Sequence, residues 1–256
     1  PMIDEGALML FLLITARMSG LVLFNPLLSR QNFPGMFRAG FVLLLSAFTY
    51  SVTGGRAEPP GGVLPLAGAL LLEMGLGFVL GMVVHFFFYI PQMAGLAIDT
   101  QMGMTMNQIY DSGSQSNMSV TGTLLNTLMI LLFFAGNGHH TLLRIMITSG
   151  EIVGYGGVSI GNDIPNLALE LFIECTVLAV KLCMPILAAE LIGQLGMGVL
   201  MKVIPQINVF SINIELKVII GLALLLMLML PVSEFLLETE KTMLASLQNM
   251  LRLMSS

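Results

Sequence analysis

Long apolar runs constrain this chain more than any other feature of its sequence. A transmembrane helix needs about 20 consecutive apolar residues. Runs that approach this length occupy Gly6–Leu28, Met36–Val52, Val63–Ile90, Met118–Ala135, Leu167–Met201 and Ile207–Val232. None of them alternates with the two-residue period of a strand in a membrane barrel. The sequence therefore predicts an all-α, membrane-associated protein built from helical hairpins.

Composition agrees with a membrane protein and argues against several other classes. Apolar residues make up 56% of the chain and charged residues 10%, whereas soluble domains are about 25% charged. The net charge of −5 and the absence of a basic run argue against nucleic acid as a partner, and lipid is the expected surrounding. The first residues, PMIDEG, are acidic rather than basic, so no cleavable signal peptide is predicted.

Several charged side chains stand inside the apolar runs. A charge at the centre of a bilayer costs about 2.5–3.5 kcal/mol on insertion scales. We therefore expect these charges to pair within a bundle, to line an aqueous path, or to lie in a subunit enclosed by others. Glu174 and Lys181 are seven residues apart on one helix face, which favours an ion pair. The candidate buried charges are Arg17, Glu73, Glu174, Lys181, Glu190, Glu215 and Lys217.

The residues that most often carry chemistry do not form a recognisable site. His139 and His140 are adjacent, so on a helix they point about 100° apart and bind one metal ion poorly. Cys175 and Cys183 lie in one apolar run about 12 Å apart, too far for a disulfide within one helix. Gly75, Gly77 and Gly81 follow no strand, and small residues at this spacing suit close helix packing instead. No catalytic, metal or cofactor site is predicted, and the chain is not expected to be an enzyme.

A segment of different character, Asp99–Ser119, interrupts the apolar runs near the middle of the chain. Met102, Met104 and Met106 alternate there with Gly103 and Thr105, before a stretch rich in Ser, Gln and Gly. Methionine is flexible and polarizable and adapts to changing partners. A secondary transporter of a small solute also keeps charges within the membrane, but it usually shows two similar halves, and no repeat is evident here. A structural component of a protein-conducting assembly is the favoured class.

The end of the chain, residues 233–256, predicts an amphipathic helix. Apolar residues recur at helical spacing, acidic residues precede them, and Arg252 lies near the end, as the helix dipole favours. We expect this tail helix to lie on a surface or a partner. Its apolar positions are Leu236, Met243, Leu247, Met250 and Met254.

An ordered set of segments resembles the FliR family, the R subunit of the flagellar export gate, and its injectisome counterparts. The first segment is LLEMGLGFVLGMVVHFFFYIPQMAGLAIDTQMGMTMNQIYD. The segments FFAGNGHHTLLRIMITS and MKVIPQINVFSINIELKVIIGL follow in the order of that family. The framework of Arg17, Pro26, Pro34 and Arg38 is similar to its beginning. The resemblance extends through Leu230.

The resemblance implies one subunit, residues 1–256, of a helical hetero-oligomeric export gate with P and Q subunits. Its first part, residues 1–164, would be similar to a P subunit, and residues 165–232 would form a hairpin similar to a Q subunit. The gate would lie in the bacterial inner membrane, within the export apparatus of the flagellar basal body. An injectisome gate is the alternative.

The same resemblance implies roles for particular residues. The central loop, residues 99–119, would plug the channel through which unfolded substrates are exported. The turn of the last hairpin would face the B-type substrate-specificity switch protein at the cytoplasmic entrance, and its residues are Lys202, Pro205 and Gln206. The plug residues would be Met102, Met104, Met106, Asn107, Gln108, Ile109, Tyr110 and Asp111.

Overall fold

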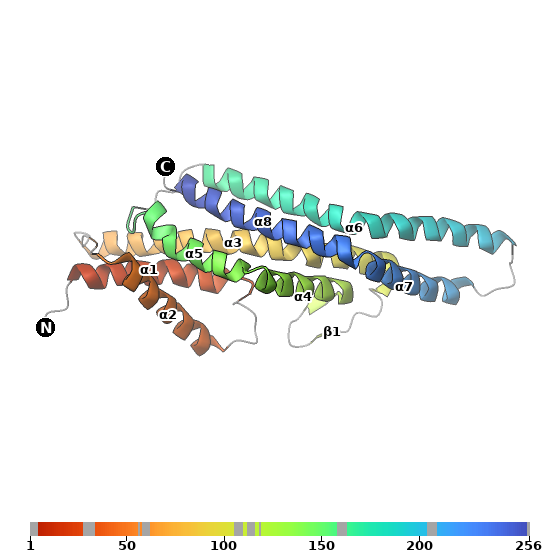
Figure 1. Ribbon diagram of the computed structural model, residues 1–256, viewed down its shortest axis with the longest axis horizontal. Helices are drawn as coiled ribbons and strands as arrows, with labels where there is room; N and C mark the ends of the chain where they lie inside the picture. Colours follow the sequence, from red (N-terminus) through yellow and green to blue (C-terminus); the bar gives the residue numbers. More distant parts are fainter. Residues whose placement is uncertain are drawn as a thin grey trace. The chain divides into compact units, whose positions relative to one another are not determined.

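The computed structural model confirms an all-α protein (Figure 1). It describes residues 5–27, 34–55, 57, 62–104, 110–111, 116–117, 119–157, 163–203 and 209–254. The helices are α1 (Glu5–Phe24), α2 (Gly35–Thr53), α3 (Val63–Met102), α4 (Val120–Ala135), α5 (Gly138–Ile152), α6 (Asp163–Val203), α7 (Val209–Met227) and α8 (Met229–Met254). Between α3 and α4, the two-residue strands β1 (Tyr110–Asp111) and β2 (Ser116–Asn117) pair antiparallel, with Tyr110 opposite Asn117 and Asp111 opposite Ser116.

The helices confirm the prediction of a membrane protein. Among the described residues, four helices are long and apolar enough to cross a membrane, namely α1, α2, α3 and α6. The number rises to six if each of two bent pairs, α4 with α5 and α7 with α8, counts as one broken span. The apolar runs of the sequence therefore correspond to helices, as their length and lack of strand periodicity indicate.

The chain forms two compact units, each assembled from separate sections of sequence. The first unit contains Pro1–Phe87, Asn137–Phe172 and Glu240–Ser256, and the second contains Phe88–Gly136 and Ile173–Thr239. In the first unit, α2 packs against both α1 and α5. The predicted likeness of residues 1–164 and 165–232 to P and Q subunits concerns other chains and stays a prediction.

Glycines allow α1 and α3 to cross closely in the first unit. A Cβ atom added at Gly77 would overlap the carbonyl oxygen of Arg17, and one added at Gly20 would overlap the carbonyl oxygen of Met74. Gly81 faces Phe24, whose Cβ would be 3.0 Å from an added Cβ. The packing role predicted for Gly77 and Gly81 is confirmed. The same prediction is wrong for Gly75, which has open space at its Cα.

Helix α3 continues beyond the point where the sequence suggested a loop. Residues 99–102, expected to begin the central loop, form the last turn of α3. The helix ends at Gly103, which has a φ of +77° and whose N–H donates to the carbonyl of Thr100 at 3.2 Å. Glycine adopts this left-handed conformation without the steric cost of a side chain, so Gly103 is the helix stop.

The tail helix begins earlier than predicted. The bend between α7 and α8 is 62° and falls at Leu228, so α8 starts at Met229 rather than at residue 233. The apolar face of α8 was expected to lie on a surface or a partner, but it is buried within the chain itself. Its buried members in the first unit are Met243, Met250, Leu251, Leu247 and Met254, each at most 2% exposed.

Candidate functional site

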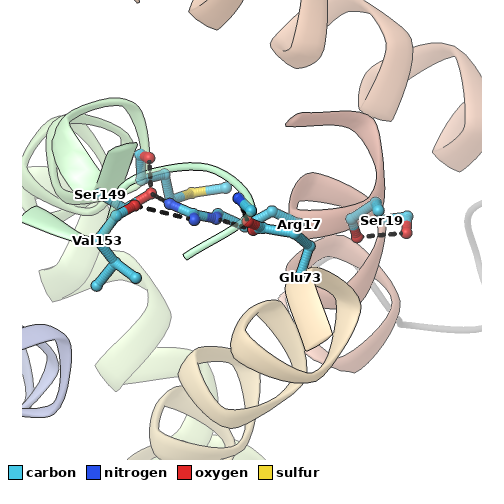
Figure 2. A network of polar contacts seen from close by, with 8 residues as sticks. Arg17, Ser19, Glu73, Ser149 and Val153 are labelled. Atoms are coloured by element: carbon cyan, nitrogen blue, oxygen red, sulfur yellow. Dashed lines mark hydrogen bonds and ion pairs between the residues drawn. The ribbon is translucent and has the colours of Figure 1, made fainter. Parts of the chain in front are cut away.

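Arg17 is the centre of a buried polar cluster in the first unit (Figure 2). The side chain of Arg17 is on α1 and is 1% exposed. Its Nε lies 2.6 Å from Oε2 of Glu73, a residue of α3 that is fully buried. Its two remaining nitrogens donate to Oγ of Ser149 at 3.2 Å and to the carbonyl oxygen of Val153 at 3.0 Å. The guanidinium is therefore satisfied by protein groups on every nitrogen.

The turn after α5 completes this cluster, which we call the Arg17 cluster. The N–H of Gly156 donates to Oε1 of Glu73 at 2.8 Å, so both carboxylate oxygens accept hydrogen bonds. Gly156 has a φ of +83°, a conformation that glycine adopts most easily. The guanidinium carbon of Arg17 lies 4.3 Å from the centre of the Tyr155 ring, within the range of a cation–π contact.

Tyr155 itself lies in a tight environment. A Cβ added at Gly150 would overlap its ring, so the glycine provides the space that the ring occupies. Burial raises the pKa of Tyr155 above its ordinary value of 10.0, while the positive charge of Arg17 and the proximity of Thr53 oppose that shift. The phenol therefore remains neutral at physiological pH.

Arg17 and Glu73 thus bond to protein groups of the same chain, and their predicted role in assembly stays a prediction. The sequence did not identify Ser149, Val153, Tyr155 or Gly156 as partners. Ser149 and Val153 contribute a hydroxyl and a backbone carbonyl, and neither group has a distinctive sequence pattern. The only local signal is the glycine pair Gly156–Gly157 at a turn, which marks a sharp change of chain direction.

The other candidate charges divide into buried and exposed groups. Glu190 is 2% exposed, whereas Glu174, Lys181 and Glu215 are exposed in the chain and Lys217 is partly exposed. Among the described residues, Glu174 and Lys181 do not form an ion pair with each other, and an ion pair of either one with another helix stays a prediction. Seven residues along α6 separate their backbones by about 10 Å, too far for direct contact. Burial of the exposed charges by other subunits stays a prediction.

Glu190 belongs to the second unit, where it lies beside the end of α3. A Cβ added at Gly221 of α7 would be 2.8 Å from Oε1 of Glu190 and would overlap the side chain of Met102. Met102 is fully buried. Oε1 of Glu190 has no hydrogen-bond partner among the described residues. Met102, predicted as a plug residue in a loop, is thus a helical residue packed against α7.

The two ends of the central segment meet through Asp99 and Ser119. Oδ2 of Asp99, near the end of α3, accepts from Oγ of Ser119 at 2.7 Å and from the N–H of Thr121 at 3.2 Å. Ser119 also caps α4, because its Oγ accepts from the N–H of Gly122 at 2.9 Å. The sequence placed Asp99 at the start of a loop and gave it no role. A Ser before a helix is a recognisable capping signal, but the sequence does not show that Asp99 lies beside Ser119.

The remaining predicted plug and turn residues are only partly described. Met104 follows Gly103 and is partly exposed, and the backbones of Tyr110 and Asp111 form β1. Met106, Asn107, Gln108 and Ile109 lie outside the described residues. Lys202 is exposed in the last turn of α6, while Pro205 and Gln206 also lie outside the described residues. Their roles as plug and partner contact stay predictions.

Comparison with known proteins identifies the family. The sequence profile of "Bacterial export proteins, family 1" matches residues 8–243, nearly the whole length of the chain. The chain belongs to this family. The predicted resemblance to FliR proteins is confirmed by relatives that carry that name. The Flagellar biosynthetic protein FliR of Bacillus subtilis (strain 168) is 26% identical over 229 residues, which cover 86% of this chain and 85% of the relative.

Other relatives of this export protein come from both flagellar and secretion systems. The Flagellar biosynthetic protein FliR of Escherichia coli (strain K12) is 26% identical over 229 residues, covering 86% of this chain and 84% of the relative. The Yop proteins translocation protein T of Yersinia pestis is 25% identical over 229 residues, covering 86% of each chain. The family is one of export components rather than of enzymes.

Proposed function

We propose that this export protein is a structural subunit of a type III protein export gate that secretes unfolded flagellar substrates. The observation that carries this proposal is the family match over residues 8–243. Relatives named for flagellar biosynthesis support the flagellar assignment. The helices long and apolar enough to cross a membrane support a place in the bacterial inner membrane. The subunit conducts substrates passively, and it binds no cofactor.

P and Q export-gate subunits are the proposed neighbours of this chain. Large apolar side chains remain exposed along α6 and α7 in the single chain, and water is a poor environment for them. Neighbouring subunits and lipid can both cover them. The B-type switch protein is the proposed partner at the end of α6 near Lys202, which is exposed. Examples of the exposed apolar residues are Leu191, Ile192, Leu195, Val199, Ile219 and Leu226.

We further propose that the central segment closes the channel at rest. A channel wide enough for an unfolded polypeptide would leak ions, and an apolar constriction can prevent this by excluding water. Met104 and Met106 offer soft apolar side chains to such a constriction. The segment leaves α3 at Gly103 and returns at Ser119, so its two ends are held by folded helices.

Conductance of the whole gate tests the plug. A variant that lacks residues 106–117 should assemble normally and should show a higher resting conductance for small ions in bilayers or cells. Exchange of Met104 and Met106 for glycine should raise conductance in the same direction. Exchange of the exposed Met184 of α6 for glycine is a control and should leave the resting conductance unchanged. An assembled gate that lacks residues 106–117 and stays as tight as the parent would show that the segment is only a connector.

An injectisome gate is the second candidate, favoured by the similarity to the Yop proteins translocation protein T. The two systems differ in the proteins that assemble with the subunit and in the substrates that they export. Purification of the chain from its own membranes, with identification of its partners by mass, distinguishes them. Recovery with flagellar basal-body components supports the flagellar gate, and recovery with needle-complex components supports the injectisome. A chain that purifies alone and accumulates a small solute would contradict both.

A further inference from the structure

We propose that one exposed face of α6 receives a helix of a neighbouring subunit, and that this helix carries a basic side chain beside Glu174 and an acidic side chain beside Lys181. This inference rests on the proposed export gate, because it requires that the chain assemble with other subunits. The residues that define this face follow one another at intervals of three and four positions, and we call them the α6 seam. They are Glu174, Val177, Lys181, Met184, Ala188 and Leu191, all exposed.

The first support is the spacing of the α6 seam. Alternating steps of three and four residues return to the same side of an α-helix, and one helix packs along another through positions with this spacing. The side chains of Val177, Met184 and Leu191 are 46%, 54% and 54% exposed. The opposite side of α6 is buried within the chain itself, for example at Leu182 and Ile186. The described part of the chain therefore leaves the seam uncovered.

The second support is the position of Lys181 within the apolar part of α6. This helix is long and apolar enough to cross a membrane between Ile164 and Leu200. A span needs about 20 residues, and every section of that length between these two residues contains Lys181. Neither Lys181 nor Glu174 has an ion pair among the described residues. Lipid is a poor cover for the seam, because charged side chains that face lipid are costly.

Water is also a poor cover for this face. The apolar side chains of Val177, Met184 and Leu191 are interspersed with the charges, and Ile173 and Val180 beside them are 54% and 47% exposed. Large contiguous apolar surfaces are typical of contacts with protein or lipid. A face that mixes charges with large apolar side chains suits another protein surface, which can match both kinds of group.

The backbone of α6 gives a third reason for a protein neighbour. Pro185 lies one turn after Lys181 and is also exposed. Proline has no N–H, so it cannot donate the usual helical hydrogen bond to the carbonyl oxygen of Lys181. Lipid offers no donor to such a carbonyl, whereas a polar side chain of an adjacent helix can supply one.

The order of the two charges specifies the chemistry of the neighbour. Glu174 and Lys181 are seven residues apart, about 10 Å along the helix. Charges enclosed at an interface are stabilised by opposite charges at the same level. The neighbouring helix therefore carries a basic and an acidic side chain about two turns apart. A second copy of this chain that runs in the same direction would place like charges at the same level, so we assign the seam to a different subunit.

Exchange of the two charges tests this order without changing the composition. The double variant Glu174→Lys with Lys181→Glu keeps the net charge and the apolar residues of the seam. The isolated chain should keep its Tm, because neither side chain has an ion pair among the described residues. The yield of the purified gate should fall at least about 10-fold, since each exchanged charge would meet a like charge on the neighbour. A yield within about twofold of the parent would overturn the proposal.

Helix α5 provides a matched control for the exchange. Arg144 and Glu151 are exposed, opposite in charge and also seven residues apart, but α5 has 15 residues and is too short to cross a membrane by itself. Arg144→Glu with Glu151→Arg should keep the gate yield within about twofold of the parent. An equal loss in both double variants would refute the assignment to α6.

A neutral substitution separates a protein neighbour from lipid. If a carboxylate of the neighbour faces Lys181, Lys181→Leu leaves that carboxylate unpaired, and the gate yield should fall at least about 10-fold. If lipid covers the seam, the same variant removes a costly charge from lipid. An unchanged or higher yield would therefore contradict the proposal.

Photo-crosslinking in the purified gate identifies what lies against the seam. A photoreactive amino acid at position 177 should attach to another subunit, in a helix that has a basic and an acidic residue about seven positions apart. Phe48 of α2 is the control position, because it is 55% exposed and α2 has no charged residue between Ala39 and Thr53. There the reagent should attach to lipid. Attachment at position 177 to lipid, to a second copy of this chain or to a segment without both charges would refute the inference.

Failure of this inference differs from failure of the proposed gate. A chain that purifies without other subunits contradicts both. A gate that assembles normally with the charges at 174 and 181 exchanged leaves the proposed function in place and refutes only the role of the α6 seam.

Discussion

Replacement of Arg17 by leucine is the perturbation whose outcome the structure defines best. Arg17 and Glu73 are both almost completely buried, and if Arg17 were lost, Glu73 would keep from the described residues only the N–H of Gly156 as a donor. Removal of one partner from a buried ion pair costs about 3–5 kcal/mol, since the other charge remains buried without compensation. We therefore expect Arg17→Leu to lose most of the assembled complex.

A loss of about 3–5 kcal/mol in stability predicts a decrease in Tm that can be measured in detergent. For a chain of this length, 1 kcal/mol changes the Tm by about 2–4 °C, so the expected decrease is about 6–20 °C. The readouts are the apparent Tm by fluorescence and the yield of assembled complex by size exclusion. Arg144→Leu makes the same chemical change at an exposed position of α5 and should shift the Tm by less than about 2 °C.

A double variant gives the sharper test of the pairing. Arg17→Leu and Glu73→Leu should each cost about 3–5 kcal/mol, because each leaves one buried charge. If the two side chains act as a unit, the double variant should cost about as much as either single variant, and far less than their sum. Additive losses would refute the reasoning and would mean that each side chain is stabilised by different partners.

Three further perturbations follow from the packing. Gly77→Ala should destabilise the protein by about 1–3 kcal/mol, because the added methyl group would overlap the backbone of α1. Gly75→Ala is the control and should be tolerated, because Gly75 has open space around it. Equal Tm values for the two variants would contradict the close crossing of α1 and α3. Met102→Ala should cost about 2–5 kcal/mol, and more than Met104→Ala, because Met102 is fully buried; thermal unfolding of both variants measures the difference. Burial raises the pKa of Tyr155 from 10.0, so its contribution to stability holds below about pH 10 and is lost as the pH rises through the higher folded value. Tyr155→Phe should therefore reduce the decline in Tm between pH 10 and pH 12, and an unchanged decline would show that other groups cause it.

Much of the fold could be predicted because its determinants are local. The length of an apolar run decides whether it can form a membrane helix, and the sequence shows that length directly. The requirement that a charge in such a run be satisfied also follows from one residue, as for Arg17. Family membership could be predicted because motifs such as LLEMGLGF and FFAGNGHH occur in a specific order.

The features that the sequence does not predict correctly depend on contacts between residues that are far apart in the chain. Glu174 and Glu190 occur in the same apolar run, yet one is exposed and the other buried, because the neighbours of α6 decide which face is covered. Met102 looked like a loop residue because polar residues and glycine follow it. Its burial depends on Gly221, more than 100 residues later, which leaves room for its side chain. The hydrogen bonds of Asp99 could not be predicted for the same reason, because its partners, Ser119 and Thr121, follow the central segment.

The Arg17 cluster also has a consequence for the order of events during synthesis. Arg17 leaves the ribosome long before its partners, which follow it by 56 residues at Glu73, 132 at Ser149 and 136 at Val153. At about 5–20 residues per second, the first partner appears roughly 3–11 s later and the last roughly 7–27 s later. During that interval α1 carries a charge that the finished protein hides, so its stable insertion should wait for later helices. A chain truncated after Thr53 should accordingly be extracted from membranes by alkali more readily than one truncated after Gly157, and equal resistance would show that α1 inserts without the cluster.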